Sequence, residues 1–234
     1  MNEKEFINEL DKIQIKINQY QLDQLKKYYE LLVEWNEKIN LTAITEKEQV
    51  YLKHFYDSAT LCKYIDFKNN TNLCDVGTGA GFPGIIIKIL FPELEVTLVD
   101  SLNKRINFLN IVIENLKLEK ISAVHARIEE FALKNREKYD IVTARAVAPL
   151  NILLEYCIPL VKINKYFIPM KGNISQEIDG SLEALKVLNS TIIDSQEFLL
   201  PKEDSKRTII RIKKISKTNK KYPRRYSEIK KNPL

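Results

Sequence analysis

The sequence predicts an α/β fold in which a mostly parallel sheet ends in an antiparallel hairpin and a helical extension precedes the sheet. Three observations support this. A glycine-rich turn over residues 73–84 ends an apolar strand and opens a run of helix-compatible apolar residues. Strand and helix patterns then alternate along the chain. The last two strand patterns, 190–200 and 206–215, leave no room for a crossover helix, so these strands must be antiparallel.

The first 66 residues have a helical pattern with no strand before residue 72. Apolar residues recur at spacings of three and four between Leu22 and Ile39, which predicts one amphipathic helix. A second helix is expected to open at a capping-box pattern over residues 45–48 and to carry His54 and Asp57. A lone histidine on an amphipathic helix is more often packed or exposed than catalytic, so the roles of these two residues stay open.

The remaining elements follow in order. We expect three regions: a helical extension (1–66), an α/β domain (67–216) and a basic C-terminal tail (217–234). Pro169 falls in the fifth strand and cannot donate to a ladder, so a bulge or irregular pairing is expected there. The predicted strands after the glycine turn are 95–100, 121–126, 139–146, 166–172, 190–200 and 206–215, and the predicted helices are 103–116, 148–159 and 175–188.

Composition sets limits on the class of protein. A chain of 234 residues that is 44% hydrophobic can bury one sizeable core and a small appendage. No run approaches the ~18 apolar residues of a membrane span, and the first five residues are not typical of a signal peptide, so we expect a cytoplasmic protein without a membrane partner. The three cysteines lack metal-site spacing and are expected to be core thiols, and no metal is expected.

Charge is distributed unevenly along the chain. Residues 202–234 hold 13 Lys or Arg against 3 acidic residues, whereas the other 201 residues hold 24 basic and 28 acidic ones. A basic terminal segment on a mildly acidic body is typical of a protein with a polyanionic partner, although a solvated tail would have the same composition. The polar residues from 217 onwards predict a mobile tail.

The glycine turn predicts a ligand site at the carboxyl end of the first strand. Gly79 to Gly84 matches the dinucleotide pattern G-x-G-x-x-G, which leaves a nicotinamide- or flavin-dependent oxidoreductase as one interpretation. Asp75 opposes it, because a carboxylate there would repel a pyrophosphate. The same carboxylate favours a cationic ligand such as S-adenosylmethionine, whose sulfonium and ammonium groups are positive. Asp100 ends the second strand, where it suits ribose hydroxyls in either cofactor.

Further polar residues end the later strands. Glu129 follows the third strand, where it or its backbone neighbours could accept an adenine amine, although an acidic residue that stabilises a helix start is nearly as plausible an interpretation. Arg145 ends the fourth strand and is expected to face the same crevice as the glycine turn, and Lys171 ends the fifth.

With these motifs placed, the chain resembles the ribosomal RNA small subunit methyltransferase G family, also called the glucose-inhibited division protein B family. The succession of G-x-G-x-G-F-P-G at 77–84 and D-S-L-x-K-R at 100–105 is specific. Two features depart from the family: the fifth strand lacks an alanine–leucine pair before Lys171, and the tail lacks a glycine-containing segment after Pro-Arg. The stretches that carry the resemblance are 35–42, 54–58, 75–84, 99–105, 127–131, 143–146, 171–172 and 222–225.

The resemblance implies a Rossmann-like class I methyltransferase that uses S-adenosylmethionine to methylate N7 of a guanine in 16S ribosomal RNA. Naked RNA and the small-subunit particle are both possible substrates, and a monomer is favoured. A non-catalytic RNA-binding module on the same fold is a further alternative, which the intact glycine turn opposes. The cofactor residues are then Asp75, Gly77, Gly79, Phe82, Asp100, Ile128, Glu129 and Arg145, the catalytic residues are Arg145 and Lys171, and Arg127, Arg145 and Lys171 are candidates for the RNA side.

The residues that are missing agree with this chemistry. Guanine N7 has an in-plane lone pair and no proton, so its methylation needs no general base. Carbon methylation of a pyrimidine needs a cysteine nucleophile, and no cysteine ends a crevice strand. Methylation of an exocyclic amine usually goes with an Asn/Asp-Pro-Pro-aromatic motif after the fourth strand, where this chain has Ala144-Arg-Ala-Val147. Catalysis would then depend chiefly on positioning and desolvation.

Overall fold

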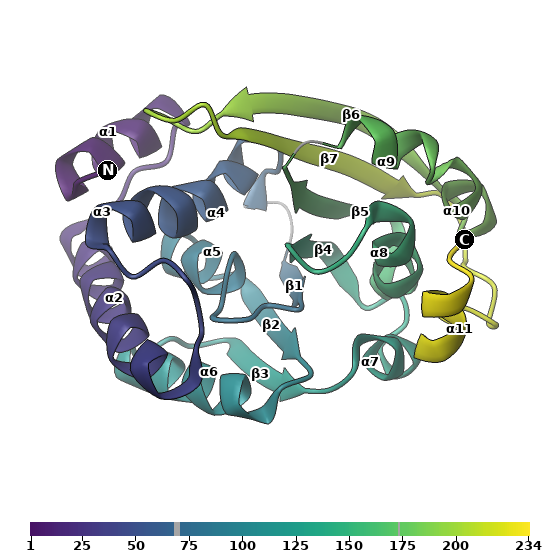
Figure 1. The fold of residues 1–234 in the computed structure, drawn as a ribbon, viewed down its shortest axis with the longest axis horizontal. Helices are drawn as coiled ribbons and strands as arrows, with labels where there is room; N and C mark the ends of the chain where they lie inside the picture. The colour runs from purple at the N-terminus through teal and green to yellow at the C-terminus, as the bar shows by residue number, and fades with distance from the viewer. Residues whose placement is uncertain (68–70, 173) are drawn as a thin grey trace.

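A seven-stranded sheet forms the centre of the protein in a computed structural model that describes residues 1–67, 71–172 and 174–234 (Figure 1). The strand order is β3-β2-β1-β4-β5-β7-β6. Strands β3, β2, β1, β4 and β5 are mutually parallel, and β7 is antiparallel to both β5 and β6. The strands are β1 (Asn72–Val76), β2 (Glu95–Asp100), β3 (Ile121–His125), β4 (Tyr139–Arg145), β5 (Val161–Lys171), β6 (Ser190–Leu199) and β7 (Lys206–Lys214).

Helices cover both faces of this sheet (Figure 1). The first layer contains α1 (Glu3–Lys12), α2 (Gln19–Ile39), α3 (Lys47–Val50), the π-helix η1 (Tyr51–Tyr56), α4 (Asp57–Ala59), the 3-10 helix η2 (Thr60–Lys63), α5 (Gly84–Leu90) and α6 (Asn103–Asn115). The second layer contains α7 (Ile128–Lys134), α8 (Leu150–Cys157), the 3-10 helix η4 (Ile158–Leu160), α9 (Ser175–Asp179), α10 (Leu182–Val187) and α11 (Tyr226–Lys231).

The N-terminal helices share one hydrophobic core with the first face of the sheet. Helix α2 packs on α5 and α6 through its apolar stripe, as expected of an amphipathic helix. Two buried glutamines fix its position: the Nε2 atom of Gln21 donates to the Ile89 carbonyl at 2.7 Å, and that of Gln24 donates to the Leu116 carbonyl at 2.7 Å. These two bonds hold the first turns of α2 against the carboxyl ends of α5 and α6.

The predicted fold class is confirmed, and the differences from the sequence prediction are local. The helix expected over 148–159 begins at Leu150, because the backbone of Pro149 is not helical (φ −55°, ψ 155°). The segment 175–188 forms two short helices, and the second N-terminal helix is capped by the Glu46 carboxylate rather than by Thr45. The β5–β7 ladder keeps one register on either side of Pro169, so there is no bulge, but Ile168 and Pro169 have no partner on β7, which is the irregular pairing that was expected. The register shift lies at the start of the β4–β5 pair.

The order of the strands creates a crevice at one edge of the sheet. The chain moves outward from β1 through β2 to β3, and then returns to place β4 on the other side of β1. Helices that follow β1 and β4 therefore leave toward opposite faces, and an opening remains outside the carboxyl ends of these two strands. Within the described residues, no helix is both long and apolar enough to cross a membrane.

The C-terminal segment is packed, which corrects the prediction of a mobile tail. Tyr222 and Ile229 are buried in the core of the second face. The Arg224 guanidinium binds both carboxylate oxygens of Glu155, at 2.8 and 2.6 Å, and Glu155 is fully buried on α8. The sequence pattern indicated only a polar, basic stretch, because the acid that pairs with Arg224 lies 69 residues earlier in the chain.

Replacing Arg224 with alanine should lower the free energy of unfolding by about 3 kcal/mol, because it leaves the buried Glu155 carboxylate without its cation. Urea denaturation monitored by circular dichroism measures this. Arg225→Ala is the matched control, since Arg225 is adjacent and exposed, and it should change stability little. Equal stability of the two variants would show that the Arg224–Glu155 pair does not fix the segment.

Candidate active site

The buried carboxylate of Asp75 in β1 holds the glycine turn between β1 and α5 from its inner side. Its Oδ2 atom accepts hydrogen bonds from the Gly84 amide at 2.8 Å and from the Thr78 hydroxyl at 2.6 Å. A Cβ atom at Gly84 would lie 2.9 Å from that oxygen and 2.3 Å from Leu98, so only glycine fits. Gly79 has φ +61°, and a Cβ atom there would meet nothing within 4 Å. The outer side of the turn is therefore open.

Asp75 is fully buried, and this burial raises its pKa to about 6 even though its two hydrogen bonds lower it. Its second oxygen, Oδ1, is also buried and has no hydrogen-bond partner among the described residues. A carboxylate oxygen without a donor is an unfavourable arrangement, which a cationic or donor group of a ligand would relieve.

Asp100, at the end of β2, holds the same turn from the other side. Its Oδ2 atom accepts from the Gly79 amide at 3.0 Å and from Arg105 at 3.2 Å, and its Oδ1 atom accepts from the Leu102 amide at 2.9 Å. Its side chain is only 3% exposed. Both oxygens thus already accept hydrogen bonds from the protein, and the predicted ribose contact of Asp100 stays a prediction.

A cavity of about 310 Å³, which we call the Glu129 cavity, opens beside the turn. It lies between the ends of β2, β3 and β4, and its lining includes Ser101, Ile128, Glu129, Val147 and Ala148. Glu129 is mostly buried and pairs with Arg127 through an Nε–Oε1 distance of 2.6 Å. The cavity therefore combines apolar walls with the Glu129 carboxylate and two basic side chains, Arg127 and Lys230, a combination of apolar surface and a few polar groups that suits a nucleoside.

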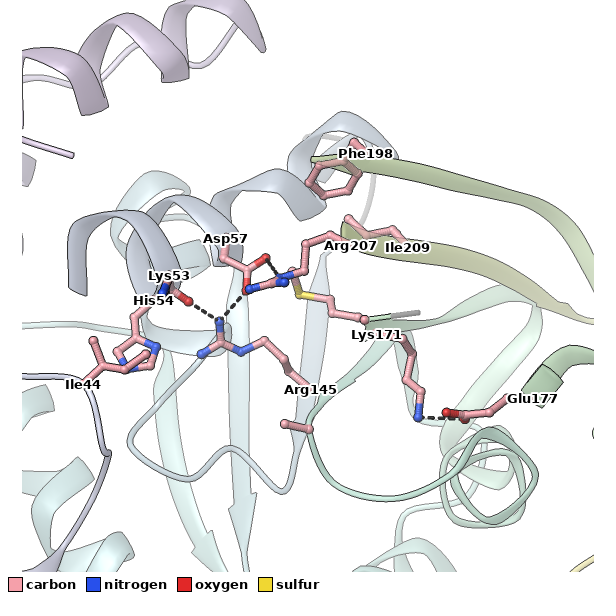
Figure 2. Close-up of a pocket in the computed structure, with 13 residues that line it drawn as sticks. Ile44, Lys53, His54, Asp57, Arg145, Lys171, Glu177, Phe198, Arg207 and Ile209 are labelled. Carbon is pink, nitrogen blue, oxygen red and sulfur yellow. Dashed lines mark hydrogen bonds and ion pairs between the residues drawn. The ribbon is translucent and has the colours of Figure 1, made fainter. Parts of the chain in front are cut away.

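A second cavity, of about 420 Å³, lies at the ends of β4 and β5, and we call it the Arg145 cavity (Figure 2). The N-terminal extension supplies part of its wall through η1 and α4. Four basic side chains line it against two acidic ones, namely Lys53, Arg145, Lys171 and Arg207 against Asp57 and Glu177.

Asp57 organises the basic side chains of this cavity. The carboxylate is 5% exposed and accepts from Arg145 at 3.2 Å and from the Nε atom of Arg207 at 3.1 Å, as Figure 2 shows. Arg145 also donates to the Lys53 carbonyl at 3.1 Å. Two guanidinium groups thus share one carboxylate, and the pair keeps an excess positive charge at the cavity wall.

Phe82 of the glycine turn contacts both Arg145 and His54. The Arg145 guanidinium is 5.3 Å from the centre of the Phe82 ring, and the His54 ring stacks on it at 4.6 Å. The Nε2 atom of His54 lies 2.8 Å from the Thr42 hydroxyl. Burial, and secondly the charge of Arg145, lower the pKa of His54 to about 4. His54 is therefore neutral at physiological pH.

Lys171 lines the opposite side of the Arg145 cavity, at the end of β5 (Figure 2). Its ammonium group donates to the Ala148 carbonyl at 2.9 Å and pairs with Glu177 at 2.8 Å. These contacts hold the loop after β4 against the end of β5. Because Glu177 also accepts from the Leu150 amide at 2.7 Å, it anchors the start of α8.

The loop after β4 belongs to both cavities. Arg145 and Ala146 line the Arg145 cavity, and the next two residues, Val147 and Ala148, line the Glu129 cavity. A Cβ atom at Gly77 would lie 2.5 Å from Val147, so this loop is in close contact with the glycine turn. The two cavities are adjacent because the first two of four successive residues line one cavity and the next two line the other.

The structure brings most of the predicted site residues to one edge of the sheet but divides them. Ile128 and Glu129 line one cavity, and Arg145 and Lys171 line the other. Asp75, which was predicted to contact the cofactor, lies beneath the turn. Arg127, a candidate for the RNA side, lines the Glu129 cavity instead.

Arg207 and Tyr226 are among the lining residues that were not predicted. Arg207 had a usable signal: β7 runs antiparallel to β5, so its first residues lie at the carboxyl end of β5, where Thr208 pairs with Lys171. Tyr226 had none, because it was placed in the mobile tail. Within the described ranges, no group of three His, Cys, Asp or Glu residues could hold a metal ion.

Comparison with known proteins agrees with this geometry. The model of a family described as rRNA small subunit methyltransferase G matches residues 21–201. The chain belongs to this family. Curated members named ribosomal RNA small subunit methyltransferase G from Exiguobacterium sibiricum and Bacillus licheniformis are 48% and 52% identical to it. Both alignments cover 100% of this chain, with 100% and 99% of the two relatives respectively.

Solved structures show the same fold at low sequence identity. A SAM-dependent methyltransferase from Aquifex aeolicus has a TM-score of 0.54 and 16% identity, and the match covers 70% of this chain and 92% of that one. A mutant 16S rRNA (adenine(1408)-N(1))-methyltransferase from Catenulisporales acidiphilia, solved with SAM, has a TM-score of 0.53 and 15% identity. That match covers 64% of this chain and 87% of the other. The family assignment and the methyltransferase fold confirm the predicted enzyme class, an rRNA methyltransferase. Neither a nicotinamide- or flavin-dependent oxidoreductase nor a non-catalytic RNA-binding module is supported.

We expect the His54 imidazole to stay neutral when the pH falls from 7 to about 5. The folded protein binds this proton more weakly than the unfolded chain, since the pKa falls from 6.5 to about 4. The unfolding free energy is therefore expected to fall as the pH drops from about 6.5 to about 4, and the full loss from His54, about 3 kcal/mol, is reached only below pH 4. Proton–nitrogen NMR titration measures the pH at which His54 binds its proton. The variant His125→Gln assigns the signals of the two histidines. A midpoint near 6.5 for His54 would contradict the expectation.

Proposed function

We propose that this rRNA methyltransferase transfers a methyl group from S-adenosylmethionine to N7 of one guanine in 16S ribosomal RNA. One observation carries the proposal: residues 145–148 line two adjacent cavities, one suited to a nucleoside and the other basic. A donor in the first and an RNA base in the second would meet along this loop. Bringing two reactants together in this way supplies a large part of the rate enhancement.

The residues around the Glu129 cavity fit S-adenosylmethionine. The open side of Gly79 allows close approach, and the buried, unpaired Oδ1 atom of Asp75 suits a cationic group. We assign Ile128 and Glu129 to the adenine, Gly77 and Gly79 to close backbone contact, and Phe82 and Arg145 to the boundary with the acceptor. When bound, the cofactor supplies an electrophilic methyl group on a sulfonium. We assign the Oδ2 atoms of Asp75 and Asp100 to positioning the glycine turn, and the Oδ1 atom of Asp100 to the Leu102 amide.

The Arg145 cavity is the proposed acceptor site. Arg145, Lys171 and Arg207 give it the positive charge that an RNA phosphate requires, and a guanidinium fork also suits the O6 edge of guanine. Guanine N7 carries no proton, so the site needs no general base. The neutral state of His54 agrees with this, because His54 is a packing partner of Phe82 in the proposed site rather than a proton acceptor.

The RNA partner follows from the same site. We propose that the extension (1–66) is part of the acceptor wall, since it supplies Lys53, His54 and Asp57 to a cavity that otherwise belongs to the methyltransferase domain (67–216). Because its proposed substrate is ribosomal RNA, we expect the enzyme to act in the cytoplasm. Either free 16S rRNA or the small-subunit particle would supply the guanine, and a monomer suffices because one chain forms both cavities.

Labelled S-adenosylmethionine tests the proposal directly. The full chain is incubated with naked 16S rRNA and, separately, with small subunits from cells that lack this gene. We expect one methyl group per RNA in the preferred substrate, recovered as 7-methylguanosine after nuclease digestion, and a single strand break after borohydride and aniline treatment. Label in an exocyclic amine, a ribose or a pyrimidine would overturn the assignment of N7.

Replacing Arg145 with alanine should leave the chain folded, because Arg207 still pairs with Asp57. We expect a loss of about 1 kcal/mol of stability from the lost hydrogen bonds and a fall of about a hundredfold in single-turnover methyl transfer. Arg145→Lys keeps the charge without the planar fork and should recover little.

Arg211→Ala is the matched control for the Arg145 variants, since Arg211 pairs with Asp194 on the hairpin, outside the cavity. It should retain normal methyl transfer. Normal transfer by Arg145→Ala would remove Arg145 from the site, and a loss of stability that accounts for the whole defect would make its role structural.

A further inference from the structure

The C-terminal segment is fixed against the second helical layer at two points. Arg136 of the α7–β4 connection donates to the carbonyl oxygens of Tyr222 and Thr218, the latter at 2.6 Å. Arg224 binds the buried Glu155 of α8, as described above. Both anchors come before α11 in the chain, so they determine where this last helix begins.

Helix α11 has one face in the core and one face at the Glu129 cavity. Ile229 is fully buried and packs in the core of the second layer. Tyr226 and Lys230 are four residues apart, lie on the same side of the helix and line the cavity. Tyr226 is 43% exposed although its backbone is anchored, because its ring borders the open cavity rather than the core.

Tyr226 also contacts the Arg127–Glu129 ion pair of the cavity, through Arg127. The Arg127 guanidinium lies 4.3 Å from the centre of the Tyr226 ring, and its Nε atom binds Glu129 at 2.6 Å. Arg127 is thus held between an aromatic face and the carboxylate assigned to the adenine. Removal of the ring would free Arg127 and, through it, Glu129.

We propose that the C-terminal segment is part of the cofactor site, with Tyr226 as the outer wall of the adenosine pocket. The inference rests on the proposed function, because it takes the Glu129 cavity as the place of the nucleoside. Tyr226 offers an aromatic face to the purine and keeps Arg127 on Glu129. The basic C-terminal segment then contributes to binding of the cofactor in addition to any contact with RNA.

The test is calorimetric titration of S-adenosylhomocysteine into the full chain. Tyr226→Ala should weaken binding by about tenfold, the scale of a lost base–aromatic stack. Tyr226→Phe keeps the ring and should bind as the wild type does. Tyr226→Leu keeps apolar bulk without the aromatic face and should show most of the loss. Tyr20→Ala is the matched control, since Tyr20 is an exposed tyrosine of α2 on the other side of the sheet.

The outcomes separate this inference from the proposed function. A wild-type chain that fails to bind S-adenosylhomocysteine would overturn the proposed function itself. If the wild type binds and the dissociation constant changes less than twofold in both Tyr226→Ala and Tyr226→Leu, the role of Tyr226 as the outer wall of the pocket is overturned and the proposed function stands. Melting temperatures, measured for every variant, exclude unfolding, and an equal loss in Tyr226→Phe and Tyr226→Ala would assign the effect to the hydroxyl and overturn the role of the ring.

Discussion

The buried carboxylate of Asp75 is the constraint on which the site depends. It lies under the glycine turn, where it holds the start of α5 through the Gly84 amide and the turn itself through Thr78. A charge in this position is unfavourable, as its raised pKa indicates, and its hydrogen bonds compensate only in part. The buried Asp75 is therefore tolerated only while the turn keeps the Gly84 amide and the Thr78 hydroxyl within hydrogen-bond distance of its carboxylate.

The N-terminal extension reinforces this turn from outside the sheet. The Tyr28 hydroxyl donates to the Ala80 carbonyl at 2.5 Å, and the Tyr28 ring lies 5.4 Å from that of Phe82. The same extension carries Asp57, which pairs with Arg145 and Arg207. Because it contacts both the glycine turn and the basic cavity, the extension couples the proposed donor site to the proposed acceptor site through direct packing.

The basic charge of the chain has two separate structural uses. Part of it is neutralised inside the protein, since Arg224 pairs with Glu155 and the fully buried Lys214 pairs with Glu137. The remainder lies at the cavity walls and on the C-terminal surface, where it is available to a polyanion. A net charge counted along the sequence therefore overstates what an RNA would encounter, because buried ion pairs cancel locally.

The sequence by itself determined the sheet, its terminal hairpin and the acids and cations at the strand ends, because periodicity and glycine spacing are local properties of the chain. It could not assign partners that lie far apart. Asp57 and Arg207 are 150 residues apart, and Arg224 and Glu155 are 69 apart. Only the tertiary structure brought these pairs together. It also decided that Arg145 and Glu129 line different cavities and that the basic C-terminal segment packs against the second helical layer.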